Sequence, residues 1–130
     1  YGLRLMEHEN EYVRAWAIQL LWEDRSAPKI ALEKLAILAA EDSSSFVRLY
    51  IASALQRTQV EDRFPVLKAL TARDEDKDDH NLPLMYWYAM EPVVGADQGQ
   101  GLALLKSTGI PILRQYIARR MTTGALASTN

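Results

Sequence analysis

The sequence predicts an all-α fold, a short right-handed α-α superhelix of about four helical hairpins, of which the first is truncated. Four similar segments carry this prediction, namely residues 13–17, 47–51, 83–87 and 113–117. Their second members fall at positions 14, 48, 84 and 114, so the steps are 34, 36 and 30 residues. Self-similarity at this period is typical of helical repeat arrays. Turn and capping residues between the segments divide the chain into short helices, which pair as antiparallel hairpins.

The first half of the chain is expected to contain three helices after residues 1–9, which we interpret as the end of a helix begun earlier. Asn10 caps a helix over residues 11–23, whose inner stripe is Val13, Ala17, Leu20 and Leu21. Pro28 opens the next helix at the position where its missing N–H costs nothing. That helix runs to about residue 40, with inner residues Ala31, Leu32, Leu35, Ile37 and Leu38. Ser45 then caps a helix over residues 46–56.

The second half is expected to contain four more helices. The first begins near Asp62, because a start at a capping box over residues 58–61 would place Pro65 in the helix interior, at a cost of ~3 kcal/mol. The others cover residues 82–92 behind Asn81, residues 97–106 with two glycines, and residues 111–121. Residues 1–121 are therefore predicted to form one repeat domain. Residues 122–130 have no apolar period and are predicted to fray.

The composition excludes several classes of function. The chain has 130 residues, 48% hydrophobic and 25% charged, which is ordinary for a folded domain. A net charge of -2 weighs against a dedicated nucleic-acid binder, which needs a basic excess. The lack of cysteine excludes disulfides, thiolate metal sites and covalent haem. No nucleophile elbow, glycine-rich phosphate loop or long apolar run is present. We therefore predict no catalytic, cofactor or metal site.

Residues 42–48, Asp-Ser-Ser-Ser-Phe-Val-Arg, resemble the inter-helix turn and second helix of HEAT repeats. In that family an aspartate in the turn and an arginine in the inner helix commonly stabilise the stacked turns. Residues 10–14 resemble a second copy, with Asn10 in place of the aspartate, and residues 108–114 resemble a poorer one. The segment 83–87 has Leu84 where the others have arginine, so the resemblance does not predict a continuous arginine ladder.

A second resemblance covers roughly the C-terminal half. Residues 79–92, 110–111 and 114–120 are similar to the HEAT-like region of large bacterial multi-domain proteins described as membrane-bound dehydrogenases or haem-binding proteins. This resemblance implies a spacer or docking module between a propeller-like dehydrogenase part and a c-type cytochrome part. The redox chemistry would then lie elsewhere in the parent, in a periplasmic or membrane-associated location. The residues themselves leave the location open.

An acidic loop, residues 74–79, has the alternating carboxylates of a calcium site. Asp74, Asp76 and Asp78 are spaced as the first ligands of an EF-hand loop are, but the glycine and the last glutamate of that motif are missing. A solvated acidic turn is therefore the preferred interpretation, with weak cation binding as the alternative.

Asp79, His80 and Asn81 form the densest polar cluster of the chain. In one interpretation it is a contact point at which His80 titrates near neutrality. The preferred interpretation is a helix cap, in which Asn81 accepts hydrogen bonds from first-turn N–H groups and Asp79 favours the positive end of the helix dipole.

Aromatic residues recur at one repeat position, namely Trp16, Tyr50, Tyr86 and Tyr116. We expect them to form the inter-repeat core, and the alternative is an aromatic row along one surface. Trp87 and Tyr88 follow Tyr86, and successive helical residues point about 100° apart. Trp87 and Tyr88 are therefore the better candidates for interface anchors at the surface.

The last helix is locally basic. Arg119 and Arg120 lie near its expected end, where their charges offset the helix dipole. That is the default explanation for both residues, and an anionic partner is the alternative.

The predicted function is that of a non-catalytic interaction module, which docks or spaces domains of a larger bacterial protein. Its partner would be another protein or a neighbouring domain, with no nucleic acid and no cofactor. The predicted contact surface comprises Arg14, Arg48, Asp79, His80, Trp87, Tyr88 and Arg114. The first alternative is an accessory domain of a dehydrogenase or c-type cytochrome protein. The second is a HEAT-like DNA base-excision enzyme, against which the acidic balance of the chain weighs.

Overall fold

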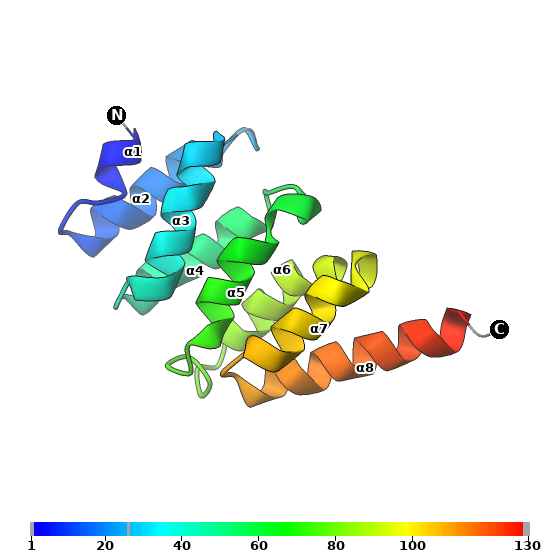
Figure 1. Ribbon diagram of the computed structural model, residues 1–130. Coiled ribbons are helices and arrows are strands. Elements are labelled where there is room, and N and C mark those ends of the chain that lie inside the picture. The colour runs from blue at the N-terminus through cyan, green and yellow to red at the C-terminus, as the bar shows by residue number, and fades with distance from the viewer. Residues whose placement is uncertain (1, 26, 129–130) are drawn as a thin grey trace.

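Helices pair into hairpins that stack in chain order (Figure 1). The computed structural model describes residues 2–25 and 27–128, and within them every regular element is helical, as the sequence predicts. The elements are α1 (Gly2–Leu5), α2 (Glu11–Leu21), α3 (Lys29–Glu41), α4 (Ser45–Leu55), the 3₁₀-helix η1 (Val60–Asp62), α5 (Phe64–Ala72), α6 (Leu82–Ala96), α7 (Gln98–Ser107) and α8 (Pro111–Ser128).

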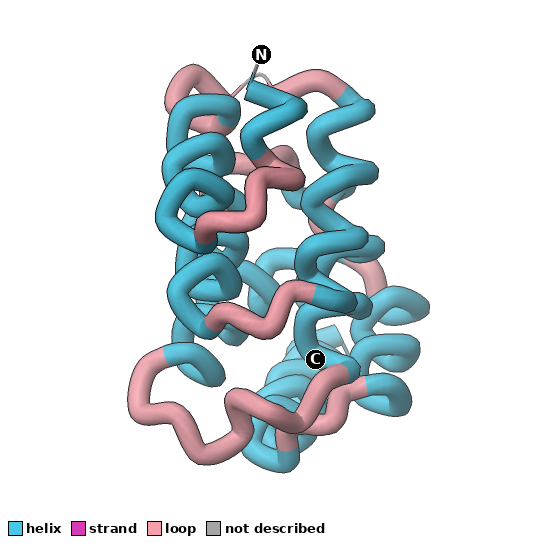
Figure 2. The backbone as a smooth tube through the Cα atoms, turned by 90° about the vertical axis from the view of Figure 1, so that its left-hand side faces the viewer, coloured by secondary structure: helices cyan, strands magenta, loops and turns pink. Residues whose placement is uncertain are grey.

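The hairpins form two layers, which Figure 2 shows as two columns of helices. In the first-helix layer α3 packs on α5 and α5 packs on α7. In the second-helix layer α2 packs on α4, α4 on α6 and α6 on α8. Each repeat therefore contacts mainly its neighbours, which is the arrangement of a solenoid. The C-terminal end of α8 extends beyond the stack (Figure 1).

One apolar core runs between the two layers through all the hairpins. Its buried residues recur at helical spacing, as with Ala31, Leu35 and Ala39 in α3 and Val47, Ile51 and Leu55 in α4. Three residues of the predicted inner stripes lie outside this core: Val13 is half-buried, Leu20 is 51% exposed and Ile37 is 57% exposed. The predictions for Leu20 and Ile37 are wrong because each lies on the side of its helix opposite the buried residues, since successive helical residues point about 100° apart.

The helix starts agree with the sequence to within a few residues. The Oδ1 atom of Asn10 accepts hydrogen bonds from the N–H groups of Tyr12 and Val13, so the predicted cap is confirmed. Ser44 rather than Ser45 caps α4, because its Oγ atom accepts a hydrogen bond from the N–H of Val47 at 3.2 Å. The helix α5 begins two residues after Asp62, and its proline lies in the first turn as predicted.

The helix α6 does not end near Pro92, as the sequence suggested, but continues to Ala96 with the proline inside it. A proline in a helix removes one hydrogen bond and strains the adjacent turn. Here Arg63 donates a hydrogen bond to the carbonyl oxygen of Ala89 at 2.9 Å, in the turn of α6 that precedes the proline. Beyond the proline, Val93 and Val94 are buried in the core. Tertiary contacts therefore offset the local cost of the proline.

The helix α8 also continues beyond its predicted end at Met121, to Ser128. The hydroxyl groups of Thr122 and Thr123 each donate a hydrogen bond to the carbonyl four residues earlier, which is compatible with a continued helix. Fraying of residues 122–130 stays a prediction, and residues 129 and 130 lie outside the described part of the chain.

Candidate interaction surface

At one end of the hairpins, a half-buried arginine, Arg14, and a buried one, Arg48, join successive turns. The guanidinium of Arg14 donates two hydrogen bonds to the carboxylate of Asp42, at 2.8 and 3.0 Å, and two more to the carbonyls of His8 and Glu9. One side chain thus ties the turn before α2 to the turn before α4. This is the aspartate–arginine link that the resemblance implied, although Asn10 acts as a helix cap and does not take the place of the aspartate.

Arg48 makes the same link one repeat later. It donates to both carboxylate oxygens of Asp76, at 2.7 and 2.8 Å, and to the carbonyl of Asp42 at 2.9 Å. The hydroxyl of Tyr86 donates a third hydrogen bond to Asp76 at 2.7 Å. The bond to Asp76 raises the pKa of Arg48, and burial, followed by the bond to Asp76, raises the pKa of Tyr86. Arg48 and Tyr86 therefore keep their usual protonation at neutral pH.

The pattern changes in the third repeat, where Leu84 stands in place of the arginine and Tyr86 donates to Asp76 of its own turn, beside Arg48. In the last repeat Arg114 donates to the carbonyl of Thr108 at 2.6 Å, the same contact six residues back that Arg14 and Arg48 make. The hydroxyl of Thr108 donates to the carbonyl of Thr71 at 3.0 Å. A neutral side chain therefore joins the turn before α8 to the end of α5.

The acidic loop is therefore not wholly a solvated turn. Asp76 is buried and its carboxylate is fully used by Arg48 and Tyr86, whereas Asp74 and Asp78 are exposed. The sequence contained a signal for this role: Asp42 and Asp76 are 34 residues apart, the same step that separates Arg14 from Arg48. Our interpretation of the loop as one acidic patch missed this repeat spacing.

Asp79 caps α6 through its side chain. Its Oδ1 atom accepts hydrogen bonds from the N–H groups of Asn81 and Leu82 at 2.8 and 2.9 Å, while the side chain of Asn81 makes no capping bond. The helix-cap interpretation is thus right for the cluster and wrong for Asn81. The bonds from Leu82 and Asn81 lower the pKa of Asp79. His80 is exposed beside this cap.

Replacing Asp79 by alanine is expected to lower the free energy of unfolding by about 1 kcal/mol at pH 7, because α6 loses its cap. Since folding lowers this pKa, the carboxylate stabilises the fold above its unfolded pKa, about 3.9, and the gain is lost as pH falls through the folded value. Urea unfolding at several pH values measures this, with Asp79→Asn as the uncharged control. A difference between wild type and Asp79→Asn that is unchanged down to about pH 2 would contradict the assignment.

The opposite ends of the hairpins are joined by groups that the sequence analysis did not single out. The indole N–H of the buried Trp22 donates to the hydroxyl of Thr58 at 3.0 Å, which links the end of α2 to the end of α4. Arg63 is buried and donates to the carbonyls of Thr58 and Ala89 at 2.9 Å each, and burial lowers its pKa. An arginine just before a helix gives no sequence signal of such a role.

The four repeated aromatic residues do not share one environment. Tyr86 is fully buried, as predicted, while Tyr50 and Tyr116 are half-buried. Trp16 is 64% exposed, so the core prediction is wrong for it. Its neighbours on α2, Ala15 and Ala17, are the buried residues, and their small side chains bring the helix backbone close to the core.

Exposed apolar side chains gather on the outward side of the second-helix layer, which we call the second-helix face. Its residues on α2 are spaced four apart and are more than half exposed, and the face also takes in side chains of α4, α6 and α8. Tyr12 contacts the ring of Phe46 at 5.0 Å, and Phe46 contacts Tyr50 at 4.9 Å, which joins α2 to α4. The members of this face are Tyr12, Trp16, Leu20, Phe46, Tyr50, Leu84, Trp87, Tyr88 and Tyr116.

A groove of about 500 Å³ lies on this face between α6 and α8, and we call it the α6–α8 groove. The rings of Trp87 and Tyr116 meet within it at 5.5 Å. It is lined by Leu84, Trp87, Tyr88, Tyr116, Arg119, Arg120 and Thr123. The structure thus unites the two predicted surface aromatics with the arginines of α8. Trp87 is half-buried against Tyr116, and Tyr88 is 56% exposed.

The other members of the predicted contact surface are placed differently. Arg48 is buried between two turns, so its side chain does not lie on that surface. Arg14 is half-buried, and its guanidinium is used by the same kind of link. Arg114 is exposed although it bonds Thr108. Asp79 is exposed but serves as a cap, and with His80 it lies at the turn end of the stack.

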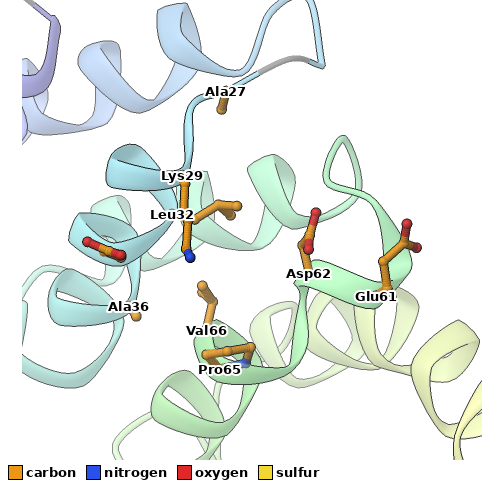
Figure 3. A pocket seen from close by; sticks show the side chains of 9 residues that line it. Ala27, Lys29, Leu32, Ala36, Glu61, Asp62, Pro65 and Val66 are labelled. Atoms are coloured by element: carbon orange, nitrogen blue, oxygen red, sulfur yellow. The ribbon is translucent and has the colours of Figure 1, made fainter.

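A second hollow, about 730 Å³, lies on the opposite layer between α3 and the start of α5 (Figure 3). Leu32, Ala36, Pro65 and Val66 form its apolar floor. Glu61 and Asp62 stand along one side, and Lys29 reaches in from the other. The hollow is thus an apolar cleft between two helices with charged side chains at its sides.

Neither a metal site nor a membrane span is found in the part of the chain that the structure describes. No group of three or more histidine, cysteine, aspartate or glutamate side chains there is placed to hold a metal ion. Within the same residues, no helix combines the length and the apolar content needed to cross a bilayer.

Stacked helical hairpins, two layers and arginine-linked turns define a helical repeat protein. The family comparison agrees: the profile described as HEAT repeats matches residues 3–80, more than half of the chain. The chain belongs to the HEAT repeat family. A search of curated proteins and a search of solved structures each returned no match. The family match ends where the stretch that resembles dehydrogenase-associated proteins begins, and nothing in the comparisons supports a dehydrogenase or haem-binding parent.

Proposed function

We propose that this HEAT repeat domain is a non-catalytic interaction module that binds a protein partner, or a neighbouring domain of its own parent, through the second-helix face. The observation that carries the proposal is the apolar stripe of α2, where Tyr12, Trp16 and Leu20 are each more than half exposed. Large exposed apolar patches on a folded domain are typical of interfaces.

The face has the composition of an interface core. Tyrosine and tryptophan dominate binding hot spots, because they bury a large area and lose little conformational entropy. Five of the side chains of this face on α2 and α6 are large, apolar and more than two-fifths exposed, namely Tyr12, Trp16, Leu20, Leu84 and Tyr88. The links between turns hold the helices at fixed spacing, so the face is presented as one rigid surface.

Site-specific cross-linking tests this proposal. The photoreactive residue p-benzoylphenylalanine replaces Trp16 or Tyr88 on the second-helix face, and Ile37 on the opposite layer serves as the matched control. All three side chains are apolar and more than half exposed, so folding is expected to tolerate each change. After exposure to native host extract, we expect one discrete adduct from positions 16 and 88, competed away by excess unlabelled protein, and none from position 37.

A specific adduct only from position 37 would contradict the use of the second-helix face. Where the partner is obtained, Trp16→Ala is expected to weaken binding by roughly tenfold or more, the effect of removing an aromatic anchor. The thermal stability of the Trp16→Ala variant should stay close to that of the wild type, since the Trp16 side chain is mostly exposed. A large loss of stability would show that Trp16 acts in folding instead.

A further inference from the structure

We propose that the α6–α8 groove binds a short acidic segment of a partner protein, whose aromatic or leucine side chain packs on Trp87 and Tyr88 while a neighbouring carboxylate pairs with Arg119. The inference rests on the proposed function, and it names the chemistry of the partner at one part of the second-helix face.

The groove has an apolar floor of suitable size for such an anchor. Its volume, about 500 Å³, exceeds that of one large side chain, and three of its seven lining residues are aromatic. The rings of Trp87 and Tyr116 already support one another at 5.5 Å, so this wall is formed before any partner arrives. Tyr88, beside this wall, is 56% exposed, so its ring is accessible to a partner. A preformed wall reduces the ordering cost of binding.

Among the lining residues that the structure describes, the charged side chains are Arg119 and Arg120, both positive. Arg120 donates a hydrogen bond to Glu91 at 3.1 Å and lies over Gly95, where a side chain would collide with its guanidinium at 2.7 Å. Arg120 thus has a partner within the chain, which partly offsets its charge. Arg119, at the preceding position of α8, is the more exposed of the two arginines and is therefore the more accessible to a partner.

This arrangement favours a carboxylate-bearing peptide over a nucleic acid. Guanidinium groups bind carboxylates with two parallel hydrogen bonds, and aromatic walls supply the anchor site that peptide recognition uses. Nucleic-acid affinity comes from neutralising many phosphates, whereas the groove offers two arginines on a chain of net charge -2.

Selection from a library of short random peptides, displayed on phage and panned against the whole 130-residue chain, tests the inference. We expect the selected peptides to combine phenylalanine, tryptophan or leucine with aspartate or glutamate. By isothermal titration calorimetry, Arg119→Glu should weaken their binding about tenfold to a hundredfold, and Tyr88→Ala about tenfold. Arg4→Glu makes the same change of charge at the other end of the stack, on α1, and should leave the affinity unchanged.

Five results would overturn the proposal. Peptides without acidic residues, or peptides that bind Arg119→Glu as tightly as the wild type, would exclude this groove chemistry. Peptides that depend on Trp16 and not on Arg119 would overturn the groove assignment but leave the proposed function intact. A library that yields no binder dependent on either residue would contradict both. Displacement of selected peptides by duplex DNA at low salt, lost in Arg119→Glu, would instead identify a nucleic-acid site.

Discussion

Arg48→Ala is expected to lower the free energy of unfolding by about 3–5 kcal/mol, a large share of the stability of a domain of this size. The side chains of Arg48 and Asp76 are each 5% exposed, and their two hydrogen bonds are 2.7 and 2.8 Å long. Without the arginine, the buried carboxylate retains only the hydroxyl of Tyr86. An uncompensated buried charge is far more costly than the loss of a surface ion pair.

Urea denaturation followed by circular dichroism at pH 7 measures this loss. Asp76→Ala and the double variant complete a cycle, in which the double variant should be less destabilised than the sum of the two single variants. Arg14→Ala is the matched control from the more exposed link, and it should cost less. A loss below about 1 kcal/mol for Arg48→Ala would mean that the link behaves as a surface pair.

Trp22→Ala is expected to cost about 3–5 kcal/mol, because it opens a cavity at the opposite end of the same hairpins. Trp22 is 1% exposed, and it belongs to the core that α2 shares with α4. Its indole N–H bonds the hydroxyl of Thr58, which in turn donates to the carbonyl of Ala54 at 2.8 Å. The variant therefore loses both packing and a buried polar link between repeats.

Thr58→Val separates the two contributions. Valine keeps the shape of the threonine but leaves the buried indole N–H without an acceptor, which should cost about 1–3 kcal/mol. Thermal unfolding by circular dichroism is the measurement, because the chain contains three tryptophans and total fluorescence would not isolate Trp22. If Thr58→Val matched the wild type in stability, the hydrogen bond would contribute nothing, and packing alone would explain the effect of Trp22→Ala.

The repeat period and the helix caps were enough to predict the architecture from the sequence. A helix start depends on residues within one turn of each other, so Asn10 and the turn position of Pro65 could be located from the sequence alone. The 34-residue step between Arg14 and Arg48 likewise predicted stacked hairpins. Asp42 and Asp76, the partners of these two arginines, are separated by the same step. Aligning the turns could therefore have predicted both links.

Contacts between residues distant in the sequence decided the rest. Pro92 was expected to end a helix, yet burial of the residues beyond it keeps α6 intact. The N–H of Gly109 donates to the carbonyl of Thr71 at 2.8 Å, and an added Cβ at this glycine would lie 2.7 Å from the carbonyl oxygen of Ala72. Such a close approach of two backbone segments leaves no signal in the sequence around the glycine.

The surface followed the same division. The sequence alone indicated that Tyr86, Trp87 and Tyr88 cannot all face one core, since they are three successive residues of one helix. Only the packing of α6 on α8 brought Trp87 and Tyr88 beside Arg119, and only the packing of α2 on its neighbours left Trp16 exposed while Ala15 and Ala17 are buried. Helical periodicity is a local property, so it can be determined from the sequence alone. Which face of a helix is left uncovered depends on how its neighbours pack, and that is decided by the tertiary structure.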